Sequence, residues 1–516
     1  MKLMLNTTDK LFANNLHMEN KYIVTIDLGT CKLGVSVARN GKGGNPEIIS
    51  YREYPSDGIS HGKVINPTRL GSALKDAIEE TERVMGIRIS RVAASLQKCD
   101  VRQVEETVNI VLGEGHCISD DDIKGLDSMV WDKVSASLET GEEVIGEIAQ
   151  CFNTGEERGI SIHNITGMMG ESLEGKYKVF VGRKTNHNNI DTAFKIAGID
   201  LVPAIFEPQK TGESILTATE LHGGVALFDM GAGASSVSIF SDGVLRYYGA
   251  IPFGGCNITS DIRDVCGISE HLAENIKKGY GGCMPDRLSL LGEKTIRIND
   301  KVSGSKIEVT AKYLSEIVTA RAREIVEALL YLIQESGYAD RIKYGITITG
   351  GGALLLNMAQ MIKEMSGYSV RLGAPSQTRI EATSDFYTAG AGTSAGLVMG
   401  MSNQEANDCA SKDDSVEKAD SFTQGGSSSD LFNPEENGHG QADEKQVADN
   451  WFERTFLSGK DRKEGEKQQN KEKKSTKKAA KDTAKKSTER TKDDTANSIG
   501  LFGMIFGDND DEDNKI

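Results

Sequence analysis

Residues 22–37 have the sequence YIVTIDLGTCKLGVSV. Alternating apolar residues on both sides of an Asp-Leu-Gly-Thr turn predict a strand, a tight turn and a second strand. An acid beside a Gly-Thr turn suits a phosphate and its magnesium ion. Turn amides and a hydroxyl donate to phosphate oxygens, and a carboxylate holds Mg²⁺ through water. The same pattern is also typical of an ordinary hairpin.

A second copy of this unit lies 202 residues further along the chain. Residues 225–239 have the sequence VALFDMGAGASSVSI, so that Asp27 aligns with Asp229 and Gly29 with Gly231. The repeat predicts two similar half-domains, whose facing hairpins would hold a nucleoside triphosphate from both sides. The candidate phosphate-binding residues are Asp27, Gly29, Thr30, Cys31 and Lys32, and Asp229, Gly231, Ala232, Gly233, Ala234 and Ser235, with Asp27 and Asp229 holding Mg²⁺ through water.

Composition limits the class of protein. The 516 residues suffice for two or three domains, and eight scattered Cys without a CxxC pair favour reduced thiols over disulfides or zinc. No run of 18 apolar residues and no signal peptide are visible, which predicts a cytoplasmic protein. The net charge is −16, although residues 460–492 carry 14 Lys and Arg against 6 Asp and Glu. An acidic body predicts no nucleic-acid partner, and the basic stretch predicts a separate tail.

Hydrophobic periodicity predicts an α/β protein with an insertion. Helices are expected at 67–85, 188–197, 207–221, 271–280 and 311–334, and buried strands at 91–96 and 201–206. The more polar residues 103–182, with a helix at 120–138, are expected to form an inserted small α+β subdomain. The expected parts are a flexible arm (1–20), a first lobe (21–102 and 183–223), the insert (103–182), a second lobe (224–383), a closing helix packed on the first lobe (384–400), a disordered linker with the basic run (401–496) and an apolar island with an acidic end (497–516).

Two further motifs suit a nucleotide. Gly350, Gly351 and Gly352 follow a strand and precede a helix expected from about residue 354, where a ligand can lie against bare backbone. On helix 271–280, Glu274 suits a ribose hydroxyl, and Lys277 or Lys278 suits an adenine face or a phosphate. The alternatives are a tight turn for the glycines and a solvated charge pair for the helix.

The order of these motifs resembles the actin-like ATPase superfamily, and within it the bacterial FtsA cell-division family, over about residues 20–400. Also similar are Asn164–Met169, the Pro-Phe-Gly-Gly segment at 252–255 and the Arg-Leu-Gly-Ala-Pro segment at 371–375. The resemblance implies two ribonuclease-H-like lobes around ATP and Mg²⁺. It also implies an adaptor that forms actin-like filaments and binds other division proteins. Such an adaptor binds the C-terminal tail of tubulin-like FtsZ, and so tethers the division ring to the inner face of the cytoplasmic membrane.

The chain departs from the family pattern in its hairpins. Ala234 stands where a Thr is usual and Cys31 where a Ser or Thr is usual, so the phosphate cradle loses two hydroxyls, although Ser235 or Ser236 can substitute. Glu207 matches the position of a water-positioning acid or amide, and an acid that caps a helix start is the alternative. We therefore expect ATP binding with at most slow hydrolysis.

The tail contains two apolar islands. One of them is expected to bind an anionic membrane, and the C-terminal island at 499–506 is favoured over the one at 447–457, because an apolar patch that follows a polybasic run provides two membrane signals. Docking in a protein groove is the rival interpretation. The acidic end of the chain is a departure from the family pattern. Anionic lipid would repel these acidic residues. The membrane candidates are Trp451, Phe452 and Phe456 in one island and Ile499, Leu501, Phe502, Ile505 and Phe506 in the other.

Three other functions on the same fold are open. An actin-fold kinase needs a carboxylate base facing its substrate and no membrane tail. A chaperone-type ATPase needs a β-rich substrate domain after residue 400. A PilM-like pilus scaffold shares the inserted subdomain but usually lacks the long tail.

Overall fold

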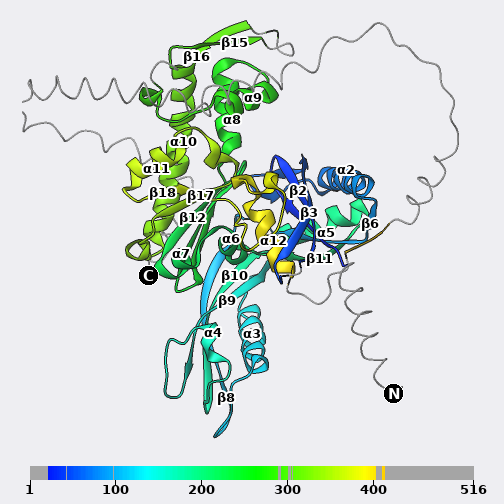
Figure 1. The fold of residues 1–516 in the computed structure, drawn as a ribbon, viewed down its shortest axis with the longest axis vertical. Coiled ribbons are helices and arrows are strands. Elements are labelled where there is room, and N and C mark those ends of the chain that lie inside the picture. The colour runs from blue at the N-terminus through cyan, green and yellow to red at the C-terminus, as the bar shows by residue number, and fades with distance from the viewer. Residues whose placement is uncertain are drawn as a thin grey trace, which may run out of the picture. The chain divides into compact units, whose positions relative to one another are not determined.

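Two five-stranded sheets of the same topology organise the described part of the chain (Figure 1). The computed structural model describes residues 21–412 except 42, 97, 289–291, 300–303, 305 and 403–408. The first sheet has the order β3 (Pro46–Pro55), β2 (Lys32–Asn40), β1 (Ile23–Leu28), β7 (Arg91–Ser95) and β11 (Asp200–Ile205). The second has the order β14 (Val244–Ile251), β13 (Ser235–Ser241), β12 (Val225–Met230), β17 (Ile346–Thr349) and β18 (Val370–Leu372).

The two sheets also share their register. Asp27 lies opposite Gly34 in the antiparallel pair β1–β2, and Asp229 lies opposite Ser236 in β12–β13. Corresponding residues of the two pairs are 202 positions apart in the chain. Each central strand also has a parallel neighbour on its other side, which is β7 for β1 and β17 for β12. The prediction of two similar half-domains, each with its own hairpin, is confirmed.

Helices cover both faces of the first sheet. Val24 and Ile26 point into a core with α2 (Pro67–Met85) and α5 (Lys184–Ala197), whereas Ile23 points into a core with α12 (Gly392–Ser402). This alternation follows from the two-residue period of a strand. The bounds of α2 follow from local chemistry, because Asn66 accepts from the Arg69 amide and Gly86 ends the helix in a left-handed conformation.

The second sheet is covered in the same way. Phe228 packs with α8 (Gly255–Cys266), α10 (Ala311–Glu335) and α11 (Met358–Ser366), and Leu227 packs on the opposite face. That face holds α6 (Pro208–Ile215) and α7 (Ala218–Gly223) instead of the single helix expected at 207–221. The helix breaks because the Thr217 hydroxyl and Glu220 form a capping box that starts a new helix. The remaining elements of this lobe are α9 (Glu270–Tyr280) and the hairpin of β15 (Thr295–Asn299) and β16 (Lys306–Thr310).

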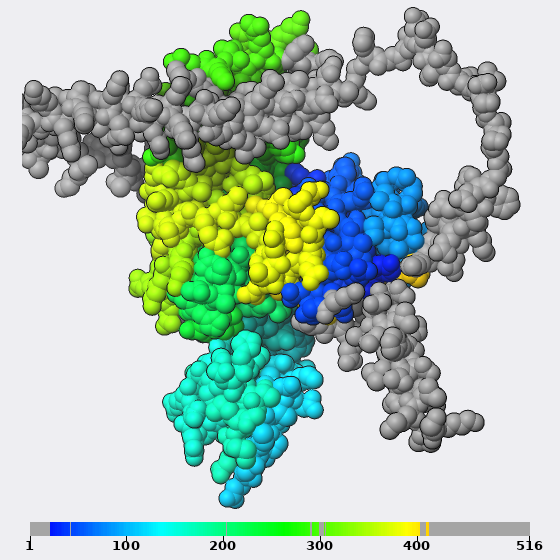
Figure 2. Space-filling model, in the orientation of Figure 1, coloured from blue at the N-terminus to red at the C-terminus, as the bar shows by residue number. Residues whose placement is uncertain are grey.

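A small subdomain, inserted in the sequence of the first lobe, projects below the two lobes in cyan and blue-green in Figures 1 and 2, and its Phe180 packs with Leu227 of the second lobe. It has a three-stranded antiparallel sheet with a core of its own around Leu126, Phe152 and Tyr177. Its elements are β8 (Arg102–Val111), α3 (Asp120–Ser135), β9 (Glu142–Thr154), α4 (Ile162–Ile165) and β10 (Ser172–Arg183).

The chain beyond the closing helix differs from the expected linker in two places. Helix α12 continues to Ser402, and β19 (Ala410–Lys412) pairs antiparallel with β6 (Ile87–Ile89). Cys409 and Ala410 are buried there, because they complete the core under α2. The short hairpin of β4 (Ile59–Ser60) and β5 (Lys63–Val64) completes the first lobe.

Residues 1–20 and 413–516 lie outside the described residues, and so do the flexible arm, the basic run and both apolar islands of the sequence predictions. Within the described part of the chain, no helix has the length and hydropathy needed to cross a membrane.

Candidate functional site

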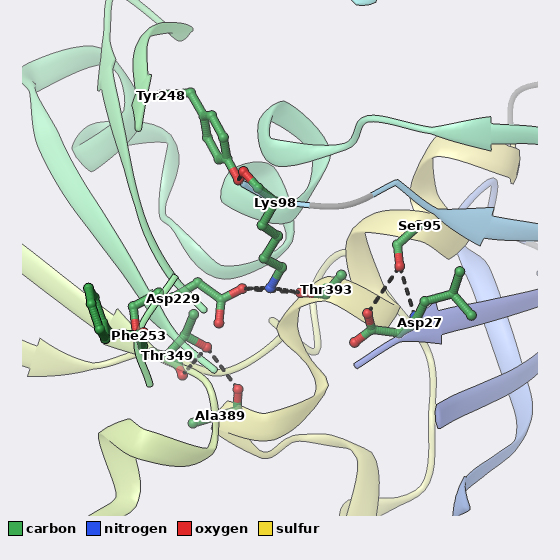
Figure 3. A network of polar contacts seen from close by, with 12 residues as sticks. Asp27, Ser95, Lys98, Asp229, Tyr248, Phe253, Thr349, Ala389 and Thr393 are labelled. Atoms are coloured by element: carbon green, nitrogen blue, oxygen red, sulfur yellow. Dashed lines mark hydrogen bonds and ion pairs between the residues drawn. The ribbon is translucent and has the colours of Figure 1, made fainter. Parts of the chain in front are cut away.

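The first hairpin brings Asp27 to the end of β1, next to the end of β7. The amide of Gly29 donates to the Lys32 carbonyl at 3.1 Å, which closes the turn. Ser95 holds the acid in place, because its Oγ donates to Asp27 Oδ1 at 3.3 Å and accepts from the Leu28 amide at 2.8 Å (Figure 3). Burial and the nearby Asp229 raise the pKa of Asp27, while Lys98 and Lys32 oppose the shift.

The second hairpin repeats this geometry with one change. The Gly231 amide donates to the Ala234 carbonyl at 3.0 Å, and Asp229 is 9% exposed at the end of β12. Ser235 is fully buried, and its hydroxyl donates to the Phe253 carbonyl at 2.9 Å. This corrects the expectation that Ser235 supplies the missing phosphate hydroxyl, because its proton is already used.

The two hairpin turns meet. A Cβ at Gly233 would lie 2.4 Å from the Oγ1 of Thr30, so only a glycine fits against this side chain. The Gly62 amide donates to the same Oγ1 at 3.2 Å, which leaves the hydroxyl proton of Thr30 for another acceptor. Thr30 therefore packs directly against the glycine turn of residues 231–233, which belongs to the opposite lobe.

Lys98, which no sequence motif indicated, interacts electrostatically with both acids and pairs with one of them. Lys98 follows β7 and pairs with Asp229 Oδ2, while its Nζ also lies 3.2 Å from Thr393 Oγ1 (Figure 3). Thr393 in turn donates to Asp229 Oδ2 at 3.2 Å. Burial alone would lower the pKa of Lys98, but Asp229 and Asp27 outweigh it and raise the pKa. The position of Lys98 after a buried parallel strand could have indicated a site residue, since ligands bind at the carboxyl ends of such strands.

Glu207 lies in a pocket that contains Lys98, Asp229 and Tyr248 among its lining residues. It is 7% exposed, and burial raises its pKa to about 8 despite the opposing effect of Lys98. It is the N-cap residue of α6, although its side chain makes no capping hydrogen bond to the amides of that helix. A carboxyl group with this pKa is mostly protonated at pH 7, and therefore donates a hydrogen bond more readily than it removes a proton.

The adenosine motif of α9 faces α8. Glu274 accepts from Thr259 Oγ1 at 2.5 Å and pairs with Lys277 at 2.7 Å. The Lys277 Nζ also donates to the Gly255 carbonyl at 2.9 Å, so this lysine ties α9 to the start of α8. The side chain of Lys278 is 71% exposed and pairs with Glu274 at 3.4 Å, which leaves it the more accessible of the two lysines.

The triple glycine lies against the second hairpin. Gly350 has a φ of 84°, and a Cβ there would lie 2.7 Å from Asp229 Oδ1. Residues Gly351–Leu354 form a 3-10 helix, and the α-helix expected from residue 354 begins only at Met358. The glycines therefore let the turn after β17 lie close to Asp229. The N-terminus of an α-helix does not lie at this turn, because α11 begins only at Met358.

Several features of this site fit a magnesium-bound nucleotide. Asp27 and Asp229 are oxygen ligands of the kind that Mg²⁺ takes, directly or through water. In addition, the buried Oγ1 of Thr211 lines the pocket and has no hydrogen-bond partner within the described structure. Lys98 would compete with the Mg²⁺ ion for Asp229, because its ammonium already pairs with this carboxylate. The described residues contain no cluster of three or more His, Cys, Asp or Glu that would hold a metal ion by itself.

Three comparisons with known proteins bear on the family. The family model described as cell division protein FtsA matches residues 226–392, which include the second hairpin and the triple glycine. Cell division protein FtsA of Streptococcus pneumoniae is 29% identical over 361 residues, covering 70% of this chain and 77% of the relative. FtsA of Pseudomonas aeruginosa is 27% identical over 355 residues, covering 69% and 83%.

A solved structure described as the PilM–PilN type IV pilus biogenesis complex shares the fold. The match has a TM-score of 0.51 at 13% identity and covers 74% of this chain and 99% of the matched chain. The predicted fold class, an actin-like pair of α/β lobes with an inserted subdomain, is confirmed. In sequence, the chain is therefore similar to cell division protein FtsA over about 70% of its length, and the FtsA family model matches its second lobe.

Proposed function

We propose that the chain is a cell-division adaptor that binds ATP and Mg²⁺ between its lobes, assembles into actin-like filaments and tethers the FtsZ ring to the inner face of the cytoplasmic membrane. One observation supports the proposal that the chain binds a nucleotide. The turn glycines of one hairpin lie against Thr30 of the other, with Asp27 and Asp229 beside them. Similarity to cell division protein FtsA supports the adaptor part, including the FtsZ tail, the copies of the chain itself and other division proteins as partners.

Each residue of the cleft has a proposed role. Thr30 and the amides at 232–234 would donate to phosphate oxygens, while Asp27 and Asp229 would hold the Mg²⁺ ion through water. Lys278 would contact the nucleoside, because its exposed side chain pairs with Glu274 only at 3.4 Å. The bound Mg²⁺ ion would neutralise phosphate charge, a task that Lys98 can share from its place beside Asp229.

Slow hydrolysis follows from the same geometry. A catalytic acid at Glu207 would have to be ionised to act as a general base, and its pKa of about 8 disfavours this at neutral pH. Cys31 and Ala234 also offer no hydroxyl to the phosphates. ATP would therefore act mainly as a ligand that stabilises the closed, assembly-competent state.

The nucleotide proposal is tested with a fluorescent ATP analogue. Asp229→Asn should weaken binding at least about tenfold, because a charged contact contributes about 1.5–3 kcal/mol. Asp121→Asn makes the same change at a 91% exposed side chain in the insert and is the matched control, expected to bind normally. Equal affinities of both variants would contradict the site assignment.

The adaptor proposal needs a second measurement. Full-length protein should sediment with anionic vesicles, and truncations after residues 440 and 496 identify which apolar island is needed. An FtsZ tail peptide should bind all three forms, because the described lobes are present in each. If no form binds the vesicles or the peptide, the adaptor proposal is contradicted in favour of the second candidate, a pilus scaffold, which the fold match to the PilM–PilN complex supports.

A further inference from the structure

Two thiols from opposite lobes lie next to each other beside the two hairpin turns. Cys31 follows the first hairpin turn, and Cys256 is the second residue of α8. Their Sγ atoms are 3.0 Å apart, although 225 positions separate them in the chain. Both are free thiols, Cys31 exposed and Cys256 half-buried, so a small solute can reach them.

The backbone holds both cysteines in place. The Cys256 amide donates to the Ala232 carbonyl at 2.8 Å, which ties the start of α8 to the second hairpin. The Cys31 carbonyl accepts from the Ser56 amide at 3.3 Å. An ordinary disulfide has an S–S length of about 2.05 Å, so bond formation needs the sulfurs to approach by only about 1 Å.

The environment makes the two thiols unequal. The hydrogen bond from Cys256 lowers the pKa of Cys31 to about 7, with Lys277 and Lys278 contributing in the same direction and burial and Glu274 opposing it. The same hydrogen bond raises the pKa of Cys256. Cys31 is therefore the nucleophilic thiolate near neutral pH, and Cys256 is its protonated neighbour.

We propose that Cys31 and Cys256 form a reversible disulfide between the lobes when a hydroperoxide oxidises Cys31. The Cys31 thiolate attacks the peroxide, which gives a sulfenic acid and releases hydroxide. The Cys256 sulfur then attacks the sulfenic sulfur, and the oxygen leaves as water with the thiol proton. In total, two thiols and one hydrogen peroxide give one disulfide and two waters.

This bond would close the phosphate site. Cys31 lies between Thr30 and Lys32, and Cys256 is bonded to the hairpin turn at Ala232, so the cross-link would span the space between the two turns. The blocking of ATP rests on the proposed function, but formation of the disulfide does not. Bound nucleotide and the disulfide should exclude each other.

The experiment treats full-length reduced protein with hydrogen peroxide and maps its peptides without reduction by mass spectrometry. A cross-linked Cys31–Cys256 peptide is expected in the wild type and in Cys117→Ser, which removes an exposed cysteine of the insert. It should be absent in Cys31→Ser and Cys256→Ser, slower to form with ATP and Mg²⁺ present, and reversed by dithiothreitol. Oxidised wild type should lose binding of the fluorescent ATP analogue.

Three outcomes overturn parts of this proposal separately. Overoxidised Cys31 without a cross-link, or Cys31 joined to a different cysteine, refutes the disulfide. A complete Cys31–Cys256 cross-link that leaves ATP affinity unchanged refutes the closure of the site. A protein that forms the cross-link but binds no ATP even when reduced refutes the proposed function instead.

Discussion

The ammonium of Lys98, carried by the first lobe, pairs with the carboxylate of Asp229, carried by the second, and Thr393 bonds to both. Asp27 and Glu207 also interact electrostatically with this ammonium. Lys98 therefore lies near three acids at the boundary between the duplicated sheets, and it forms its ion pair with Asp229.

Replacing Lys98 should destabilise the protein. In Lys98→Met the acids lose their cation, and breaking such a pair costs about 3 kcal/mol or more when it is buried. The side chains here are 26% and 12% exposed, so we expect about 2–3 kcal/mol in the free energy of unfolding by urea. Lys124→Met, whose side chain is 74% exposed, is the control and should change stability by less than about 0.5 kcal/mol. The double variant with Asp229→Asn should recover part of the loss, and strict additivity would show that the two side chains do not interact.

Two glycines should respond to the same substitution with opposite signs. A Cβ at Gly212 in α6 would lie 2.1 Å from the Cζ of the buried Phe240, whereas a Cβ at Gly125 in α3 meets nothing within 4 Å. Gly212→Ala should cost about 1–3 kcal/mol through overpacking. Gly125→Ala should stabilise its helix by up to about 1 kcal/mol. Thermal unfolding measures both, and stabilisation by Gly212→Ala would mean that α6 does not pack on Phe240 in solution.

The pH dependence of stability should contain a contribution from Glu207. Its folded pKa of about 8 lies above the unfolded value of 4.5, so the folded state binds more protons between these pH values and loses stability as the pH rises through them. Glu207→Gln removes this contribution. Its stability relative to the wild type should rise from about pH 5 to pH 8, by at most about 4 kcal/mol. Urea unfolding at a series of pH values measures the difference, and a constant difference would mean that Glu207 is ionised in the folded state throughout.

The strand after the closing helix should protect the edge of the first lobe. Residues Ala410–Lys412 pair with β6, and the Cys409 amide donates to the Tyr22 carbonyl at 2.9 Å. A chain truncated after residue 402 should therefore exchange the amide hydrogens of Ile87–Ile89 faster than a chain truncated after residue 412. Hydrogen exchange followed by mass spectrometry compares the two forms. Identical protection would show that β19 does not pair with β6 in solution.

The sequence could predict the hairpins because their chemistry is local. An apolar strand, an acid, a glycine turn and another strand are neighbours in the chain, and their repetition at 202 residues indicated the duplicated lobes before any contact was known. The bounds of α2 were also predictable, since Asn66, Pro67 and Gly86 cap it locally. The break before α7 was missed because a capping box at Thr217 competes with a continuous apolar pattern.

The sequence by itself determined the two-lobed fold, the two acids and the glycine turns, because strand periodicity and turn chemistry act over a few residues. Only the tertiary structure decided which side chains share the site. Lys98 reaches Asp229 across 131 positions, and Cys31 meets Cys256 across 225. It also assigned the Ser235 hydroxyl to the Phe253 carbonyl. These pairings depend on how two sheets and α12 pack against one another, and no local pattern in the chain encodes that packing.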